Sequence, residues 1–195
     1  MTIRVEASDE GKNFSCGRSG NCCHHINVPL NCYDMERLIK VKPWEEWLDL
    51  IVMTKEEIKE FGAETIPVYI DGKMMLPVLQ AKKNDDCYFF GRDEKGLGGC
   101  TIWLHRPRVC RTYPFESDEH GKPVFLQEAK DIGCWSEGMG LKPDAGYIKD
   151  LQLLDQESDL DEKITRAWNE KGSGKVPDFV PFVLDQMKQH HAKKK

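Results

Sequence analysis

Eight cysteines constrain this chain more than any other feature, because their meeting or separation decides whether a metal can be bound. They stand at Cys16, Cys22, Cys23, Cys32, Cys87, Cys100, Cys110 and Cys134. Two stretches are dense, FSCGRSGNCC at 14–23 and CTIWLHRPRVCRTYPF at 100–115, and the second sets two cysteines among three arginines. Clustered thiols that persist in a reducing compartment are typical of metal ligands or redox groups. The sequence therefore predicts a metal centre in preference to four disulfides.

Length and charge restrict the other functional classes. The chain has 195 residues, enough to bury a core without metal, and a net charge of −5, which does not favour non-specific nucleic-acid binding. No apolar run approaches the 18 residues of a membrane span, and the first residues do not resemble a signal peptide. We expect a cytoplasmic protein with a protein partner or complex, and neither a nucleic-acid nor a membrane partner.

The first half of the chain predicts several short helices. Asn31 can cap a helix over residues 34–41, and Pro43 is expected to start another, with Trp44, Trp47, Leu48 and Ile51 on its apolar face. Val28 and Leu30 alternate as in a short strand. Thr54 and Glu57 form a capping-box pattern for a helix that Gly62 would close.

Strand patterns then alternate with loops before the composition becomes helical. Asp71-Gly72 between TIPVYI and KMMLPVL predicts a hairpin with a type I′ turn. Further short strands are expected at CYFF, CTIWL and PVFLQ, and helices from Asp144 and from Pro177. The prediction is an α+β fold: a small cysteine-rich metal-binding domain over 1–140 with short antiparallel strands and several helices, and a helical C-terminal extension over 141–195.

The cysteine spacing bears on the kind of metal centre. Four thiolates suit zinc or an iron–sulfur cluster, but the paired Cys-x2-Cys knuckles of structural zinc sites are missing. An iron–sulfur centre is favoured by the aromatic neighbours of the cysteines and by arginines that could compensate the charge of an anionic cluster. We therefore expect a four-iron four-sulfur cluster, with zinc as the alternative. Arg106, Arg108 and Arg111 also suit a carboxylate or phosphate ligand, which a guanidinium can bind in bidentate fashion. We expect Arg111, which stands between Cys110 and Tyr113, to matter most.

Two features leave the ligand set open at this point. Neighbouring side chains in an extended segment point to opposite faces, so Cys22 and Cys23 need not bind one metal, and one of them could simply pack. His24, His25 or His105 could supply one ligand, although surface or supporting roles are the stronger expectation.

Together these residues resemble the YkgJ-type cysteine-cluster family, a zinc- or iron-chelating domain that is also found in flagellin lysine N-methylases. The resemblance rests on FSCGRSGNCC, VPLNCYDMERL, CYFF, CTIWLHRPRVCRTYPF and Cys134, and covers about Phe14 to Cys134. It implies metal ligands at Cys16, Cys22, Cys23, Cys87, Cys100, Cys110 and Cys134, with Arg106, Pro107, Arg111 and Pro114 in the motif frame. One departure is clear: Ser19 stands where the family has its second cysteine, so this position is dispensable or Cys32 replaces it.

Three functions follow as hypotheses. The first is an iron–sulfur protein that serves electron transfer or supports a larger enzyme complex. The second, implied by the resemblance, is a protein lysine N-methylase in which Arg106 or Arg111 holds the carboxylate of S-adenosylmethionine, although no glycine-rich turn for this cofactor is present. The third is a zinc-stabilised interaction module. No motif assigns an activity, so the sequence does not decide whether the chain is an enzyme.

Overall fold

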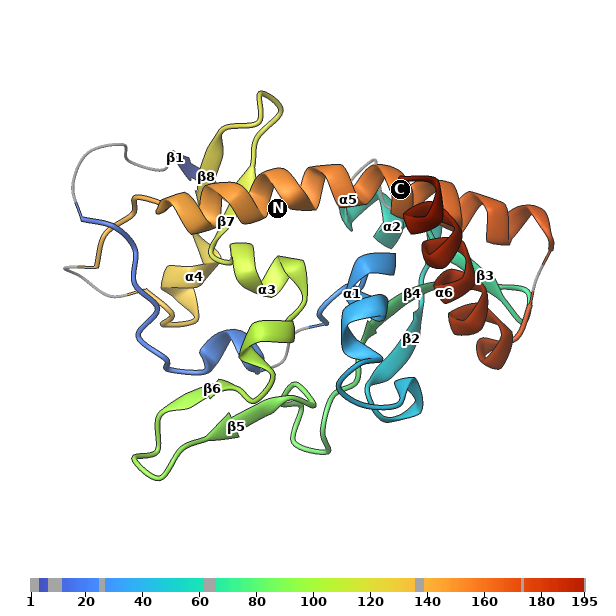
Figure 1. Cartoon of the computed structure of the whole chain (residues 1–195). Coiled ribbons are helices and arrows are strands. Elements are labelled where there is room, and N and C mark those ends of the chain that lie inside the picture. The colour runs from blue at the N-terminus through green and yellow to red at the C-terminus, as the bar shows by residue number, and fades with distance from the viewer. Residues whose placement is uncertain are drawn as a thin grey trace. The chain divides into compact units, whose positions relative to one another are not determined.

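The structure, a computed structural model, describes residues 4–6, 12–24, 27–61, 66–135, 139–172 and 174–194. Within these ranges it contains six α-helices and short strands that pair antiparallel in three small sheets, which confirms the α+β prediction (Figure 1). The chain divides into two compact units, each made of two segments. Unit 1 comprises Met1–Ile26 and Ala81–Asp155, and unit 2 comprises Asn27–Gln80 and Gln156–Lys195. The expected boundary near residue 140 stays a prediction.

Unit 1 contains a sheet, a hairpin and short helical turns. Its sheet has the order β1 (Arg4–Glu6), β8 (Pro123–Leu126), β7 (Phe115–Ser117), and its hairpin joins β5 (Phe90–Arg92) to β6 (Gly98–Cys100). The helical pieces are η1 (Asn21–Cys23), η3 (Trp103–His105), α3 (Arg108–Thr112), α4 (Glu128–Asp131) and the start of α5 (Ala145–Glu170).

Aromatic side chains form the core of unit 1. Phe14, Phe115 and Phe125 are almost fully buried, together with Ala129 and Leu151. The rings of Phe14 and Phe115 meet edge to face with centroids 5.8 Å apart, a favourable geometry for aromatic pairs. Phe14 of this core stands two positions before Cys16 in the sequence, and Cys134 packs against the core. The core therefore anchors two of the cysteine-bearing segments.

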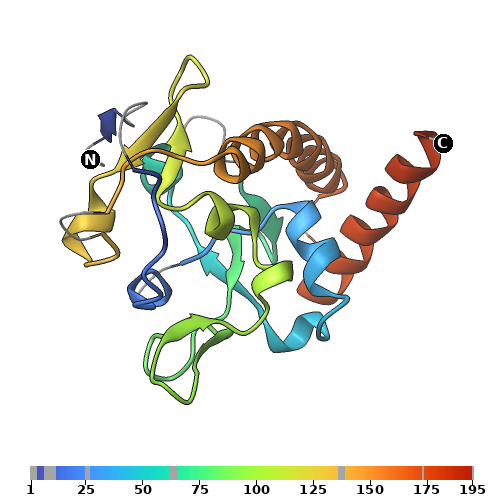
Figure 2. The same cartoon turned by 60° about the vertical axis from the view of Figure 1, so that its left-hand side comes forward.

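Unit 2 is built around a second three-stranded sheet. Its strand order is β2 (Leu48–Val52), β4 (Lys73–Leu79), β3 (Val68–Ile70). The helical pieces are α1 (Cys32–Leu38), η2 (Trp44–Glu46), α2 (Lys55–Phe61), the rest of α5, and α6 (Val176–Lys193). Helix α1 lies beside α6 in both views (Figures 1 and 2). Met53, Leu76 and Val78 form a small core on this sheet.

Several local predictions are confirmed in unit 2. The Asn31 side chain accepts the backbone N–H of Asp34 as the predicted cap of α1. Thr54 and Glu57 exchange both hydrogen bonds of a capping box before α2, while the expected stop at Gly62 lies outside the described residues. Asp71 and Gly72 have φ angles of 48° and 73°, as a type I′ hairpin turn requires.

Other local predictions are wrong. Pro43 precedes a single 3-10 turn, not a helix, because Leu48–Val52 pairs along its whole length with β4 and includes two adjacent β-branched residues. The strand expected at CYFF begins at Phe90, and the strand expected at CTIWL ends at Cys100. Val28 belongs to no strand, and its neighbour Pro29 makes one isolated bridge to Val78. Pairing with the distant strand β4 accounts for the first of these differences.

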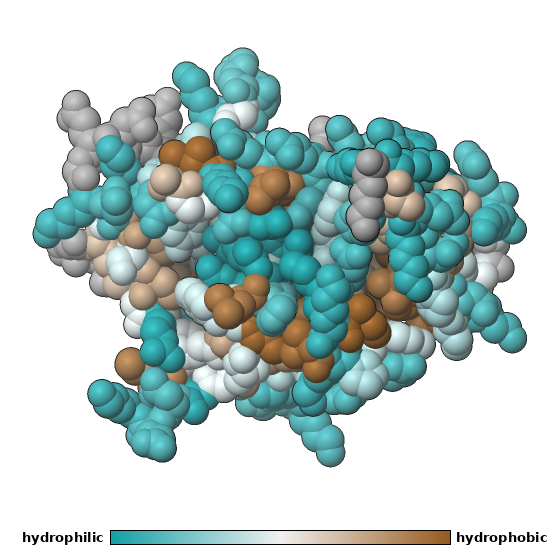
Figure 3. Space-filling view, viewed as in Figure 1, coloured by the Kyte–Doolittle hydropathy of each residue, from teal (hydrophilic) through white to brown (hydrophobic). Residues whose placement is uncertain are grey.

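In the second half of the chain, the observed elements agree more closely with the predicted ones. The strand at PVFLQ and the helices from Ala145 and Val176 are where the pattern predicts them. Among the described helices, none combines the length and the apolar character needed to cross a bilayer. The surface drawn in Figure 3 is mostly hydrophilic, with scattered apolar patches. Trp103 and Leu104 are among the exposed large apolar side chains, at 48% and 78% exposure.

Candidate metal centre

The segment from Cys16 to Cys23 folds into a tight loop that ends in the 3-10 turn η1. Gly20 has φ +81°, and a Cβ there would lie 2.4 Å from the Phe90 ring, so only glycine fits this position. The turn is closed by the Cys23 N–H, which donates to the Gly20 carbonyl at 2.8 Å. Cys22 and Cys23 therefore lie in a turn and not in an extended segment. The rule that neighbouring side chains of an extended segment point to opposite faces does not apply to them.

A side-chain tether joins this loop to the segment that carries Cys134. The Asn21 amide donates to the carbonyl of Ile132 at 2.7 Å. Gly133, with φ +71°, follows directly, and the Cys134 N–H donates to the carbonyl of Ala129 at 2.8 Å. Two segments more than 100 residues apart are thereby held together. No sequence pattern indicates this role for Asn21.

Four thiols gather where these segments meet. The Cys22 thiol shares hydrogen bonds with the thiols of Cys134 and Cys23, and Cys16 is close enough to act on it electrostatically. The hydrogen bond from Cys134 lowers the pKa of Cys22, but the Cys23 bond, burial and the neighbouring thiols raise it to about 12. For Cys134 the hydrogen bond with Cys22 and burial raise the pKa. We call Cys16, Cys22, Cys23 and Cys134 the four-cysteine group.

The donor chemistry of the four-cysteine group fits zinc or iron, which thiolates prefer. Over the described part of the chain, however, no three Cys, His, Asp or Glu side chains are already arranged to hold a metal ion. In addition, hydrogen bonding between their thiols and burial contribute to a raised pKa of both Cys22 and Cys134. Metal binding would therefore have to remove their protons and draw the sulfurs together, so affinity would rise with pH.

An unsatisfied hydroxyl beside the thiols also fits a metal-bound state. The Tyr113 oxygen is buried and has no hydrogen-bond partner among the described residues, and the charges of Cys134 and Cys22 help burial to raise its pKa. A buried hydroxyl without a partner is unfavourable by about 1–3 kcal/mol. Thiolates produced by metal binding are strong acceptors and would remove this penalty. The Trp135 indole N–H, next to Cys134, is likewise unpaired within the described residues.

A second pair of thiols is formed by Cys87 and Cys100. Burial raises the pKa of both, and the two are close enough to interact electrostatically. The Cys87 N–H donates to the carbonyl of Cys23 at 2.7 Å, which links this pair to the four-cysteine group. Arg106 acts in the opposite direction and partly offsets the rise in the pKa of Cys100. Cys110 lies partly buried on α3, and its role as a ligand stays a prediction.

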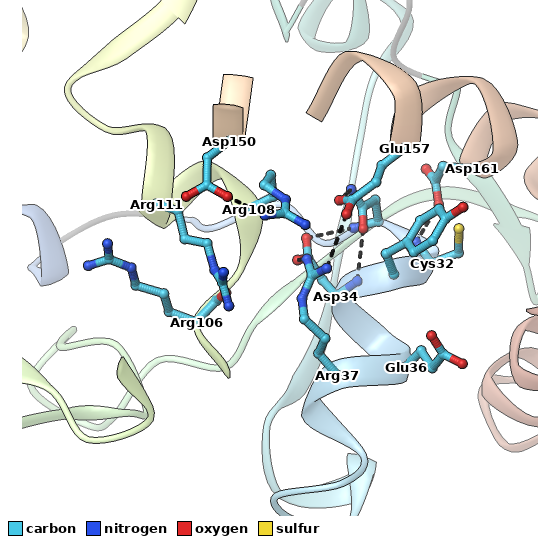
Figure 4. Close-up of polar contacts among 12 residues, drawn as sticks. Cys32, Asp34, Glu36, Arg37, Arg106, Arg108, Arg111, Asp150, Glu157 and Asp161 are labelled. Atoms are coloured by element: carbon cyan, nitrogen blue, oxygen red, sulfur yellow. Dashed lines mark hydrogen bonds and ion pairs between the residues drawn. The ribbon is translucent and has the colours of Figure 1, made fainter. Parts of the chain in front are cut away.

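The three arginines of the central stretch have different surroundings (Figure 4). Arg106 stacks on Trp103 with 3.6 Å from the guanidinium carbon to the ring centroid. Arg108 is 7% exposed and pairs with Asp150. Arg111 donates to the carbonyls of Arg106 and Leu104, and so fastens the turn before α3. Carboxylate binding by Arg106 or Arg111 stays a prediction.

Cys32 belongs to unit 2 and has other partners. It is fully buried at the start of α1, and its N–H donates to Asp161 Oδ1 at 2.6 Å (Figure 4). The seven cysteines predicted as ligands all belong to unit 1. Ser19, in contrast, lies at the four-cysteine group, with its Oγ 3.9 Å from Cys134 Sγ.

The three histidines that were considered as possible ligands differ in their surroundings. His24 contacts Asp86 through its Nδ1 and packs edge to face on Phe90. His105 is exposed on η3. His25 lies outside the described residues.

Comparison with known proteins identifies one family. The CxxCxxCC model, described as "Putative zinc- or iron-chelating domain", matches residues 15–130, which is more than half of the chain. The comparisons found no matching curated protein and no matching solved structure.

Proposed function

The chain belongs to the CxxCxxCC family of zinc- or iron-chelating domains, and we propose that it binds its metal through Cys16, Cys22, Cys23 and Cys134. The observation that carries this proposal is the contact between the loop that bears Cys16, Cys22 and Cys23 and the segment that bears Cys134, where the Asn21 amide donates to the Ile132 carbonyl at 2.7 Å and Ser19 Oγ lies 3.9 Å from Cys134 Sγ. These sulfurs come from segments far apart in the sequence, and the Asn21 tether supports their approach. A metal would cross-link the two segments, so the binding energy would stabilise unit 1.

The close approach of the thiols favours a single ion. Sulfur ligands of one tetrahedral zinc are roughly 3.8 Å apart, since each Zn–S bond is about 2.3 Å long. The Cys22 thiol interacts with both Cys23 and Cys134, and drawing these sulfurs together onto one ion would give this spacing, whereas the ligands of a four-iron cluster bind four different irons and lie farther apart. Mononuclear zinc or ferrous iron is therefore our first candidate.

An iron–sulfur centre is the second candidate, and a separate observation favours it. Cys87 and Cys100 lie near each other, Cys87 is hydrogen-bonded to the backbone of Cys23, and Arg106 places positive charge near Cys100. Additional thiolates and a compensating cation are features of protein-bound clusters. In this form the protein would transfer electrons or support a larger enzyme, and the exposed Trp103 and Leu104 would be a suitable contact for a protein partner.

Purification without oxygen, followed by metal analysis and absorption spectroscopy, tests both forms. One zinc or iron per chain without inorganic sulfide would support the single ion. Four irons with four sulfides and a broad charge-transfer band would support the cluster. Neither metal at stoichiometric level, even after anaerobic reconstitution with each, would refute the proposal.

Cysteine variants test the ligand set. We expect Cys22→Ala and Cys134→Ala to lose the metal, because each removes one of the thiols in mutual contact. Cys32→Ala provides the matched control, since it removes a cysteine of unit 2 that is hydrogen-bonded to Asp161. Circular dichroism of each variant checks folding. Equal loss of metal from Cys32→Ala and Cys22→Ala would contradict the assignment.

A further inference from the structure

Position 19 faces the four-cysteine group although it is occupied by serine. In the family pattern Cys-x2-Cys-x2-Cys-Cys, this chain has Cys16, Ser19, Cys22 and Cys23, so a hydroxyl stands in place of the second thiol. The hydroxyl still contacts one of the thiols, because Ser19 Oγ lies 3.9 Å from Cys134 Sγ. The sequence alone left open whether this position had lost its role.

Both sides of this contact are anchored. On the Ser19 side, Gly20 adopts its positive φ angle against the Phe90 ring, and a Cβ on Gly98 would approach the Ser19 carbonyl to 3.0 Å. On the Cys134 side, the carbonyl of Ile132 receives the Asn21 amide. The backbone that carries Ser19 is thereby held close to the Cys134 segment.

The hydrogen bond has only one possible direction once a metal is bound. In the metal-free protein either the hydroxyl or the thiol could donate. A metal-bound cysteine is a thiolate and has no proton, so only Ser19 can then donate. Its Oγ also accepts the Asn21 N–H at 3.3 Å, and a hydroxyl that accepts one hydrogen bond is a better donor in the next.

We propose that Ser19 is a positioning residue of the metal centre, which donates a hydrogen bond from its hydroxyl to the metal-bound thiolate of Cys134. This inference rests on the proposed function. The hydrogen bond reduces the charge that the sulfur gives to the metal and stabilises the thiolate against protonation. Hydrogen bonds to ligating sulfurs are one of the ways in which proteins set the properties of zinc and iron sites. Where the family has a cysteine ligand, this chain thus has a hydroxyl that donates a hydrogen bond to another ligand.

Cobalt(II), which reports thiolate bonds through charge-transfer absorption, is the probe for the first test. Ser19→Ala removes the donor, so the charge-transfer band should move to lower energy and the affinity at pH 7 should fall about tenfold. Ser19→Thr keeps a hydroxyl and should restore both values. Ser15→Ala, an exposed serine in the same loop, should change neither. Unchanged spectra and affinity in Ser19→Ala would overturn the proposal.

Ser19→Cys distinguishes a donor from a ligand. If Ser19 only donates to Cys134, the four-cysteine group already supplies the ligands, and the charge-transfer intensity per bound cobalt should stay at the wild-type value. An increase equal to one further thiolate would show that position 19 is a ligand position and would overturn the donor role. Failure of the wild type to bind cobalt, zinc or iron would instead refute the proposed function, and this inference with it.

Discussion

Asp161 is a carboxyl group whose protonation should affect stability near neutral pH. Burial raises its pKa to about 6, and the charges of Asp34 and Glu157 act in the same direction, although the Cys32 N–H partly opposes them. Arg37 pairs with Asp34 and Glu157 and leaves Asp161 without that compensation (Figure 4). The folded state thus holds the proton more tightly than the unfolded state. Stability from this group is complete below about pH 4 and is lost as the pH rises through 6, by about 3 kcal/mol in total.

Asp161→Asn should remove this pH dependence. The amide oxygen can still accept the Cys32 N–H, and it carries no charge that burial would penalise. Urea unfolding at pH 4 to 7.5 should show that the free energy of unfolding falls less steeply in the variant, with a gain of about 2–3 kcal/mol at pH 7.5. Asp159→Asn, an exposed carboxylate on the same helix, is the control and should keep the wild-type slope. Parallel curves for Asp161→Asn and wild type would show that Asp161 titrates normally.

Tyr113→Phe should have opposite effects on the metal-free and metal-bound protein. In the metal-free protein the variant removes a buried hydroxyl that lacks a partner among the described residues, so stability should stay equal or rise by about 1 kcal/mol. In the metal-bound protein it removes a donor to the thiolates, so zinc affinity should fall severalfold. Chemical unfolding with chelator and a competitive zinc titration measure the two effects. Tyr69→Phe, on β3 in unit 2, should change neither, and a loss of metal-free stability in Tyr113→Phe would contradict this account.

At the scale of single elements, Gly20 should be the most sensitive position of the cysteine loop. Gly20→Ala combines a positive φ angle with a Cβ placed 2.4 Å from Phe90, so it should destabilise unit 1 by about 2–4 kcal/mol and weaken metal binding. Gly96→Ala has a similar φ angle of +76° and no atom within 4 Å of the new Cβ, so it should lose only about 1 kcal/mol. Urea unfolding of both variants measures the difference. Equal losses would mean that Phe90 moves aside freely.

The same elements show what the sequence could and could not predict. Caps and tight turns were predictable because their determinants are local, as at Asn31, at Thr54 with Glu57, and at Asp71-Gly72. The helix expected after Pro43 was wrong because pairing with β4, more than 20 residues away, outweighs a local start signal. Likewise, cysteine type and number indicated a metal centre. Which thiols meet depends on the Asn21–Ile132 hydrogen bond, which joins residues 111 positions apart and has no signature in the sequence.

For the molecule as a whole, the location of the cysteines makes metal removal a test of how the two units depend on each other. All seven predicted ligands belong to unit 1, so a metal that binds only the folded state stabilises that unit directly, by about 4 kcal/mol at a free metal concentration 1,000 times Kd. We expect a chelator to increase amide hydrogen exchange in η1, α4 and the β5–β6 hairpin. The β2–β4–β3 sheet of unit 2 has its own core around Met53, Leu76 and Val78, so its protection should persist. Exchange that increases equally in both units would show that they unfold together, whereas no increase in η1 would contradict a metal centre at the four-cysteine group.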